Sequence, residues 1–335
     1  MESIGNITAG SEKTILRTML TSRAFEEEIC RLNDIHALHG TNHVAIGQEA
    51  GHTGLCFVLN EDDWIIATHR GHGFYLARTG DVEGMAHEMY GTKYGMCKGL
   101  GGSMHFSDMA NHYICSTGIV GAGVPIALGA AMNLKYFNKK GIVAAAFGDG
   151  ASNQGMVFES MNIASMRGLP LLFYCENNQY AVSSPSSRFI ANTTAAKRAE
   201  GFGIASAVID GNDVNEVISA CLKAKEYILK EQKPFYMEAV TYRYAGHSRS
   251  DRLVYRTKDE EAPWREKDPI SLYEKYLIER GVIDEPEAQG IRKEAFERVH
   301  KAYLSAKASE NEHIDYEQAV AIGEGTWEGK YEKLS

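Results

Sequence analysis

Several features that would place this chain in a special class are missing from it. None of the six cysteines forms a C-x-x-C pair, which argues against a zinc cluster and against a disulfide framework. No stretch reaches the roughly 18 apolar residues of a membrane-spanning helix. The N-terminus has neither the apolar core of a secretory signal nor the composition of a transit peptide. We therefore expect a reduced, soluble, cytoplasmic protein without a membrane partner.

A concentration of positive charge is also missing. The formal net charge is −9 and no run of Lys and Arg stands out, so the chain lacks the basic face that a general nucleic-acid binder needs. What is present is typical of a globular protein. The chain has 335 residues, of which 44% are hydrophobic and 24% charged, so it is long enough to bury a substantial core.

The middle of the chain alternates between two kinds of segment. Short apolar runs, which read as buried parallel strands, alternate with longer helical patterns. This alternation predicts βαβ units and an α/β fold: an open, mostly parallel sheet with helices on both faces. The expected strands are 141–147, 169–175, 205–209 and 235–244, and the expected helices are 124–137, 152–166 and 214–229.

The two ends of the chain are predicted to be helical. Apolar residues recur at helical spacing over 11–38, and helix returns over 270–305. Between them, residues 245–266 are polar and lack periodicity, which indicates an active-site loop or a mobile segment. We find no internal repeat. The simplest organisation is one domain over 1–335, with an N-terminal helical segment (about 10–40), a C-terminal helical extension (about 268–335) and a tail at the end.

One pair of motifs carries chemistry. The strand at 141–147 ends in Gly148-Asp149-Gly150, and the next strand ends in Glu176-Asn177-Asn178, with 26 residues between Gly150 and Asn177. A bare carboxylate at a strand end loses hydration at a cost of several kcal/mol, which a metal relieves. Carboxylate and amide oxygens suit Mg²⁺. Flanking glycines and a following helix N-terminus suit a phosphate. Either half alone is equally well a turn, but the pair at this spacing is specific.

The spacing resembles the diphosphate and Mg²⁺ motif of thiamine-diphosphate enzymes. When the neighbouring sequence segments are included, the chain is similar to the alpha subunits (E1 alpha) of heterotetrameric 2-oxo acid and acetoin dehydrogenases over roughly residues 10–310. The segments that carry the resemblance are HRGHG (69–73), KGLGGSMH (98–105), GIVGAGVP (118–125), GDGASNQG (148–155), ENNQYAVS (176–183) and YRYAGHSRSD (242–251).

The resemblance implies a set of site residues. Asp149, Asn178 and the Tyr180 carbonyl would bind Mg²⁺, and the Gly150 and Ala151 N–H groups would bind the diphosphate. Further cofactor contacts would come from Arg70, Gly118, Val120, Val182, Arg243 and His247. The two arginines suit a diphosphate because the guanidinium fork binds phosphate oxygens in pairs. Val182 stands where relatives place an apolar wedge that bends the cofactor.

Histidines add the proton chemistry. Alone, a histidine is more often structural than catalytic, but with the resemblance His247 and His72 correspond to active-site histidines that handle protons near neutral pH. His105 is a weaker candidate. His69 departs from many pyruvate-specific relatives, which have Tyr there, and matches acetoin-type relatives. Ser248 and Ser250 match positions that some relatives phosphorylate, and nothing in the sequence shows that they are modified.

The implied function needs partners. Relatives use thiamine diphosphate and Mg²⁺ to decarboxylate a 2-oxo acid, or to cleave acetoin, and they pass the acyl unit to a lipoyl-bearing E2 component. The glutamate that activates the cofactor lies in their E1 beta subunit, and we find no segment resembling the domain that carries it. We therefore expect an alpha2beta2 heterotetramer and an alpha chain that is inactive alone.

Alternatives remain for the substrate and for the class. Pyruvate is favoured, with acetoin as the alternative and a branched-chain 2-oxo acid as a further one. A split transketolase-like subunit shares the strand-end motifs, and a non-catalytic assembly subunit would keep the fold. A nicotinamide-binding fold, suggested by Gly121-Ala122-Gly123, is rejected because Ile126 occupies the third glycine position of that fingerprint.

Overall fold

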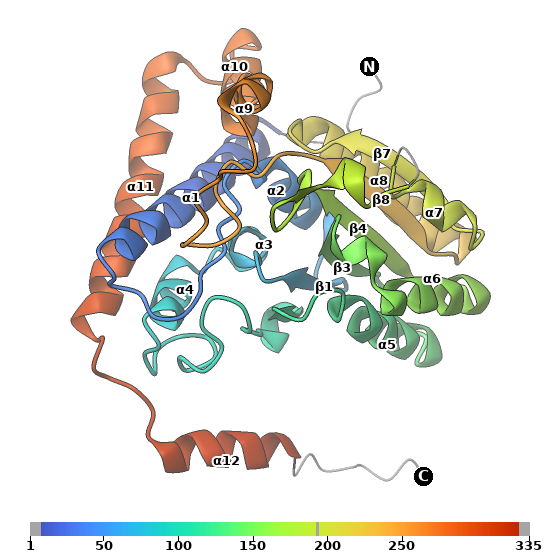
Figure 1. The fold of residues 1–335 in the computed structure, drawn as a ribbon, viewed down its shortest axis with the longest axis horizontal. Coiled ribbons are helices and arrows are strands. Elements are labelled where there is room, and N and C mark those ends of the chain that lie inside the picture. The colour runs from blue at the N-terminus through green and yellow to red at the C-terminus, as the bar shows by residue number, and fades with distance from the viewer. Residues whose placement is uncertain (1–7, 192–193, 328–335) are drawn as a thin grey trace.

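A single six-stranded parallel sheet forms the centre of the molecule (Figure 1). The structure is a computed structural model that describes residues 8–191 and 194–327. The strand order is β2-β1-β3-β4-β8-β7, and each neighbouring pair is parallel. The strands are β1 (Trp64–Thr68), β2 (Tyr113–Thr117), β3 (Val143–Gly148), β4 (Leu171–Asn177), β7 (Ala205–Asp210) and β8 (Phe235–Val240), with a separate antiparallel pair, β5 (Tyr180–Ala181) and β6 (Ser184–Pro185).

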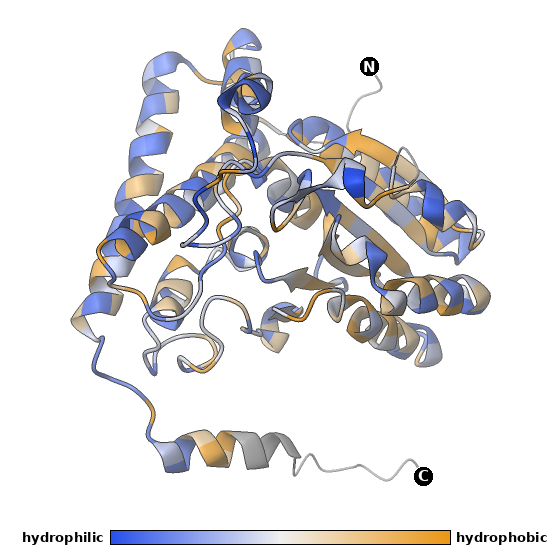
Figure 2. Cartoon of the chain, viewed as in Figure 1, coloured by the Kyte–Doolittle hydropathy of each residue, from blue (hydrophilic) through white to orange (hydrophobic). Residues whose placement is uncertain are grey.

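The alternation of side chains along each strand separates two hydrophobic cores. In β3, Ala144 and Ala146 face the core formed with α1 (Ala9–Asp34), α2 (Glu49–Val58) and α8 (Val214–Glu231). Ala145 and Phe147 face the core formed with α5 (Gly123–Tyr136) and α6 (Gly155–Arg167). Because successive strand residues point to opposite faces, a strand with two buried faces must be apolar throughout. In Figure 2 the central strands are mostly pale to orange, whereas α9 (Lys258–Arg265) is blue. The predicted α/β fold is confirmed.

Helices from both ends of the chain pack together on one side. Thr8 caps α1 by accepting from the Ser11 N–H, and α11 (Glu285–Ala308) runs along α1. α10 (Pro269–Glu279) also contacts α1, and α12 (Tyr316–Trp327) lies away from the body in Figure 1. The remaining helices are α3 (His72–Thr79), α4 (Val82–Met89), α7 (Lys197–Glu200) and the 3-10 turns η1 (Met109–Asn111), η2 (Ala151–Asn153) and η3 (Ser186–Arg188).

The predicted helical ends are therefore present, but parts of the prediction lie beyond the structure. The last residues of the expected C-terminal extension and tail, 328–335, fall outside the described residues. The count of one domain stays a prediction. Within the described ranges, no helix combines the length and the apolar character needed to cross a membrane.

Element boundaries differ from the prediction for identifiable reasons. Strands β1 and β2 were not predicted, because each is only 5 residues long and lacks a clear pattern. The strand expected over 235–244 ends at Val240, which pairs with Asn177 at the end of β4. The residues beyond it leave the regular ladder: the Arg243 N–H donates to the Asn178 carbonyl, and the Tyr244 N–H donates to the Ile46 carbonyl. The region expected to be a loop, 245–266, contains the helix α9. Thr257 caps the N-terminus of α9, because its side chain accepts a hydrogen bond from the Glu260 N–H.

The strand order fixes where a ligand can bind. From β1 the chain crosses to β2 on one side, and β3 then pairs with the other side of β1. The connections that leave the carboxyl ends of β1 and β3 therefore diverge and leave a crevice between them. In open parallel sheets this topological switch point is where ligands bind.

Candidate active site

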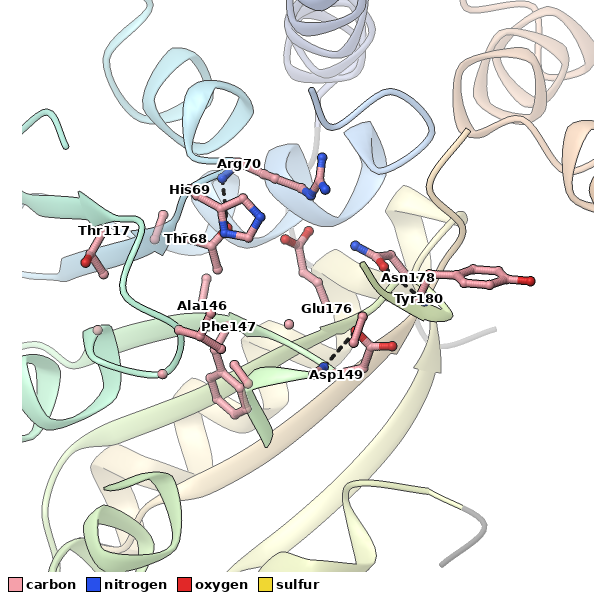
Figure 3. A pocket seen from close by; sticks show the side chains of 18 of the residues that line it. Thr68, His69, Arg70, Thr117, Ala146, Phe147, Asp149, Glu176, Asn178 and Tyr180 are labelled. Atoms are coloured by element: carbon pink, nitrogen blue, oxygen red, sulfur yellow. Dashed lines mark hydrogen bonds between the residues drawn. The ribbon is translucent and has the colours of Figure 1, made fainter. Parts of the chain in front are cut away.

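A cavity of about 290 Å³ lies at this switch point. Its walls come from the carboxyl ends of β1, β3 and β4 and from the segment that follows β8. Figure 3 shows Asp149, Glu176 and Asn178 at neighbouring strand ends, with His69 and Arg70 across from them. The cavity thus gathers segments that are far apart in the sequence, and most of the predicted site residues are among them.

The Asp149 carboxylate is buried and only partly satisfied. Asp149 is only 2% exposed. Its Oδ1 accepts a hydrogen bond from the Gly150 N–H at 2.9 Å, whereas its Oδ2 has no hydrogen-bond partner among the described residues. Burial raises the pKa of Asp149 from 3.8 to about 6, because the charged form is poorly solvated there. An unpaired buried carboxylate oxygen aimed into a cavity fits a cation.

Further oxygens stand beside Asp149 because β3 and β4 are in register. Gly148 pairs with Glu176, so the residues after these two positions lie side by side. The Asn178 amide group donates to Gln48 Oε1 at 3.1 Å, and its Oδ1 accepts from the Tyr180 N–H at 3.3 Å. The Tyr180 side chain is fixed by a hydrogen bond to Glu260 of α9 at 2.6 Å. Together these contacts place hard oxygen atoms on one side of the cavity, as Mg²⁺ requires.

Gly150 has no room for a side chain. A Cβ built on it would lie 2.7 Å from the Cβ of Ala181, so the backbone at the end of β3 and the segment after β4 approach closely. Ala151 opens the η2 turn, and α6 follows directly. Backbone N–H groups at such a start of helical structure form a site for an anion.

Two buried guanidinium groups line the same cavity. Arg70 is 4% exposed and Arg243 is 1% exposed, and neither has a carboxylate within ion-pair distance among the described residues. Arg70 donates to the carbonyls of Val44 and His247, and Arg243 donates to the Val182 carbonyl at 2.8 Å. Burial, and then the charge of Arg243, lower the pKa of Arg70 to about 9. Two uncompensated cations in a cavity create a site for a polyanion.

The loop after β8 is fastened to Arg243. Arg243 donates to the Tyr255 hydroxyl oxygen at 2.7 Å, and the Tyr255 hydroxyl donates to Asp251 at 2.6 Å. Asp251 also accepts from the His247 N–H at 2.6 Å. His247 is consequently held at the cavity, as predicted for a residue of the active site. Ser248 is half-buried and Ser250 is exposed, with their hydroxyl oxygens 3.5 Å apart.

Three imidazoles meet where this loop approaches β1. One ring nitrogen of each of His43, His69 and His247 lies within 4.8 Å of those of the other two. Burial, together with the charge of nearby arginines, lowers the pKa of His43 and His247 to about 4 and that of His69 to about 2. All three rings are therefore neutral at physiological pH.

The backbone at Val182 is in an unusual conformation. Its φ is 55°, the left-handed region that a β-branched residue rarely adopts. The residue lines the cavity, and its side chain is 54% exposed. Strain of this kind persists where the surroundings impose it, most often at functional sites. The conformation directs an apolar side chain into the mouth of the cavity, which is the geometry expected of a wedge.

Not every predicted site residue lies at the cavity. Of the predicted cofactor contacts all but Gly118 line it. Gly118 packs instead against His105. His72 is fully buried, with Nδ1 at 3.1 Å from Glu26 and Nε2 at 2.9 Å from the Ser103 hydroxyl. The structure does not bring His72 to the cavity, and its catalytic role stays a prediction that its contacts do not support.

The KGLGGSMH segment also has a structural explanation. Glu88, which is fully buried, accepts from the N–H groups of Cys97, Gly99, Gly101 and Gly102. A Cβ on Gly99 would lie 2.2 Å from the Gly91 carbonyl oxygen. The glycines in this motif therefore let the chain wrap around one carboxylate.

Some cavity residues were not identified from the sequence, namely Gln48, Glu176 and, as a neighbour of the imidazoles, His43. His43 and Gln48 lie in the connection between α1 and α2, which has no periodic pattern. Only the folding of that connection against β1 and the His247 loop shows their role. Glu176 carried a usable signal, because it stands at the end of an apolar strand beside the predicted ligand Asn178.

Comparison with known proteins identifies the group to which this geometry belongs. A family model described as "Dehydrogenase E1 component" matches residues 17–315. The pyruvate dehydrogenase E1 component subunit alpha of Rhizobium meliloti is 40% identical over 83% of this chain and 80% of its own length. The alpha subunit of the Bacillus subtilis acetoin:2,6-dichlorophenolindophenol oxidoreductase is 36% identical over 85% of each chain.

A third relative is the mitochondrial pyruvate dehydrogenase E1 component subunit alpha of Schizosaccharomyces pombe, which is 38% identical over 86% of this chain and 70% of its own length. The family match over residues 17–315 covers the strand-end motifs, both cavity arginines and the His247 loop. The chain therefore belongs to the dehydrogenase E1 component family, as an E1 alpha subunit.

Proposed function

We propose that this E1 alpha chain binds thiamine diphosphate together with Mg²⁺ in the cavity at the switch point. The observation that carries the proposal is the presence of unpaired buried charges of both signs in one cavity. The Asp149 carboxylate has an unpaired buried oxygen, and Arg70 and Arg243 are buried with no carboxylate within ion-pair distance among the described residues. A diphosphate bound through a divalent cation supplies both missing charges at once.

Different residues of this chain would bind the metal, the diphosphate and the apolar part of the cofactor. Asp149, the Asn178 side chain and the Tyr180 carbonyl would hold the metal, and the Gly150 and Ala151 N–H groups with Arg70 and Arg243 would hold the diphosphate. Val182 and Val120 would contact the apolar part of the cofactor, and His247 would stand at the reacting end. When bound, the cofactor supplies the electron sink for breaking a bond next to a carbonyl.

We propose that an E1 beta subunit covers the mouth of the cavity. Its mouth exposes apolar side chains, with Ile119 66% and Val120 50% exposed. Exposed apolar groups at the edge of a polar site are typical of a surface that another subunit covers. We propose an alpha2beta2 assembly that passes its acyl product to a lipoyl-bearing E2 component, and a cytoplasmic location.

Two substrates fit the proposed activity. Pyruvate is favoured by the sequence, and the relatives named as pyruvate dehydrogenase subunits support it. Acetoin is the second candidate, and a specific observation favours it: His69 adds a second imidazole to the cavity lining beside that of His247, with His43 behind both. Both substrates carry a two-carbon acyl unit next to a bond that the cofactor can break.

The test is to co-express the chain with its candidate beta subunit and to follow reduction of an artificial electron acceptor. Pyruvate, acetoin and a branched-chain 2-oxo acid would be compared, each with and without thiamine diphosphate and Mg²⁺. We expect turnover that needs both and that falls at least ~1000-fold in Asp149→Ala, because electrostatic stabilisation of this size is usual for metal sites.

Asp62→Ala is the matched control, because this carboxylate is exposed and remote from the cavity. It should retain full turnover. An assembled complex that holds the cofactor yet turns over none of the substrates would refute the proposed activity. Turnover by the rigorously purified alpha chain alone would refute the need for a beta subunit.

A further inference from the structure

The three imidazoles at the cavity are not equivalent, and their hydrogen bonds set their roles. This inference rests on the proposed function and assigns residues to its substrate. His43 and His69 meet edge to face with ring centres 4.6 Å apart, and His43 and His247 lie 4.7 Å apart. His69 and His247 line the cavity, whereas His43 is buried behind them.

The partners of two rings fix their protons. His43 Nδ1 lies 2.6 Å from the His247 carbonyl oxygen. A carbonyl only accepts, so His43 carries its proton on Nδ1. His247 Nδ1 lies 3.2 Å from Arg70 Nη2. A guanidinium only donates, so His247 Nδ1 is the acceptor, and the proton of this neutral ring is on Nε2. His247 therefore offers an N–H donor to a ligand.

His69, by contrast, can accept a hydrogen bond or a proton from a ligand. No hydrogen bond joins either of its ring nitrogens to another described residue, and its Nε2 is buried without a partner. Because the ring is neutral, one nitrogen always has a free lone pair. Burial and the positive charge of Arg70 hold the pKa of His69 down. An anion bound by Arg70 and Arg243 would offset that charge and make His69 more basic.

A donor and a free acceptor side by side discriminate between the two substrate classes. A 2-oxo acid offers only acceptor oxygens, and the loss of CO₂ requires no proton to be removed. A 2-hydroxy ketone offers a carbonyl acceptor and a hydroxyl donor. When its bond between the carbonyl carbon and the hydroxyl-bearing carbon breaks, the electron pair stays with the carbonyl fragment, and the hydroxyl proton must leave as the aldehyde forms. That step needs a base.

We propose that His69 is the catalytic base that accepts the hydroxyl proton of a 2-hydroxy ketone, while the Nε2–H of His247 binds the carbonyl oxygen of the same substrate. His43 is a positioning residue, since it holds the His247 backbone and packs on both rings. The substrate class assigned to this site is thus a small 2-hydroxy ketone such as acetoin, from which the complex releases an aldehyde.

The test uses the assembled alpha–beta complex with thiamine diphosphate and Mg²⁺. The kcat/KM values for acetoin and pyruvate would be measured for the wild type, His69→Phe and His300→Gln. His69→Phe should lower kcat/KM for acetoin at least ~100-fold more than for pyruvate, the size expected for loss of a general base. His300→Gln should leave the ratio unchanged, because His300 lies on the exposed side of α11 with 56% of its side chain accessible.

A binding measurement gives a second readout that does not depend on turnover. The complex would be loaded with a non-reactive deaza analogue of the cofactor, and the Kd of acetoin would be compared with that of its methyl ether, 3-methoxy-2-butanone. The wild type should bind acetoin roughly 10-fold more tightly, about the value of one hydrogen bond. His69→Phe should remove that preference.

The outcomes separate this inference from the proposed function. Turnover of pyruvate without cleavage of acetoin, or an equal loss for both substrates in His69→Phe, would overturn the role of His69 and leave the E1 activity standing. Absence of turnover with every substrate, despite a bound cofactor, would overturn both. Retention of the cofactor Kd by His69→Phe would show that the variant is folded.

Discussion

Buried charges in this molecule fall into two regions that differ in one respect. Away from the cavity, buried charges are satisfied within the chain. Arg23 contacts Glu49 at 2.5 Å and Asp268 at 2.8 Å, and Lys225 contacts Asp63 at 2.5 Å. The buried carboxylates of Glu88 and Glu238 have no ion pair but accept hydrogen bonds from N–H groups. At the cavity, Asp149, Arg70 and Arg243 are just as deeply buried, yet they have no ion-pair partner among the described residues.

The difference shows what each group of charges is for. Burying an ion costs several kcal/mol unless a partner or hydrogen bonds offset it. The paired charges join α1, α2 and α10 and are complete within the chain. The unpaired ones leave the free chain less stable than it would otherwise be, and this cost is recovered only when a ligand of opposite charge binds. A carboxylate oxygen without any hydrogen bond and two guanidinium groups without an ion pair, all in one cavity, therefore distinguish the proposed binding site.

The largest effect is expected in the paired region. Arg23→Met should lower the free energy of unfolding by about 3–5 kcal/mol, because it leaves the Glu49 carboxylate buried without a counter-charge. Urea unfolding at pH 7 measures this value. Arg17→Met is the control, since the Arg17–Glu294 pair is exposed on both sides and should contribute less than about 1 kcal/mol. Equal effects of the two substitutions would remove the distinction between the regions.

A substitution at the cavity should have the opposite sign. The pKa of Asp149 is about 6 in the folded chain and 3.8 ordinarily, so folding favours the protonated form. In the absence of metal and cofactor, stability is highest below pH 4 as far as this group is concerned. The free energy of unfolding then falls, by about 3 kcal/mol in total, as the pH rises through 6.

Asp149→Asn should therefore stabilise the free chain at pH 7 to 8, approaching that value, while it weakens binding of the cofactor. Unfolding free energies of both chains across pH 4 to 8 test this, with Asp62→Asn as the exposed control. A stability difference that does not vary with pH would contradict the unpaired state of Asp149.

The smallest effect concerns backbone strain. Val182→Gly should raise the stability of the free chain by up to about 1 kcal/mol, because glycine adopts a φ of 55° without strain. It should also weaken cofactor affinity. Val208 is similarly exposed, at 45%, but lies in β7, so Val208→Gly should destabilise the chain instead. Thermal unfolding distinguishes the two signs, and a loss of stability in both variants would argue against strain at Val182.

The side of the cavity proposed to bind metal and diphosphate was predictable where its residues stand at strand ends. Asp149 and Asn178 each follow a buried strand directly, and adjacent parallel strands end at the same edge of a sheet. Local pattern and topology are then enough to bring them together. The fold class was predictable for the same reason, since β3, β4 and β8 are apolar runs separated by helical patterns.

The imidazole side was not predictable in this way. His43, His69 and His247 come from three separate connections, and only their tertiary placement shows that they meet. The same limit explains His72, whose motif suggested catalysis although Glu26 and Ser103 hold it inside the core. It also explains why β1 was missed, since its short strand is defined by its neighbours β2 and β3.

The run of alanines in β3 has a consequence for the dimensions of the active site. Ala144, Ala145 and Ala146 are fully buried or nearly so, with the two helical layers packed on either side. Their small volume allows α5 to approach the central strand closely, and a larger residue there has no free space to fill. Ala146 also lines the cavity, so the spacing of the layers at β3 contributes to the dimensions of its floor. A designer who wished to admit a bulkier substrate would change the spacing of the layers at β3 rather than the residues that touch the substrate.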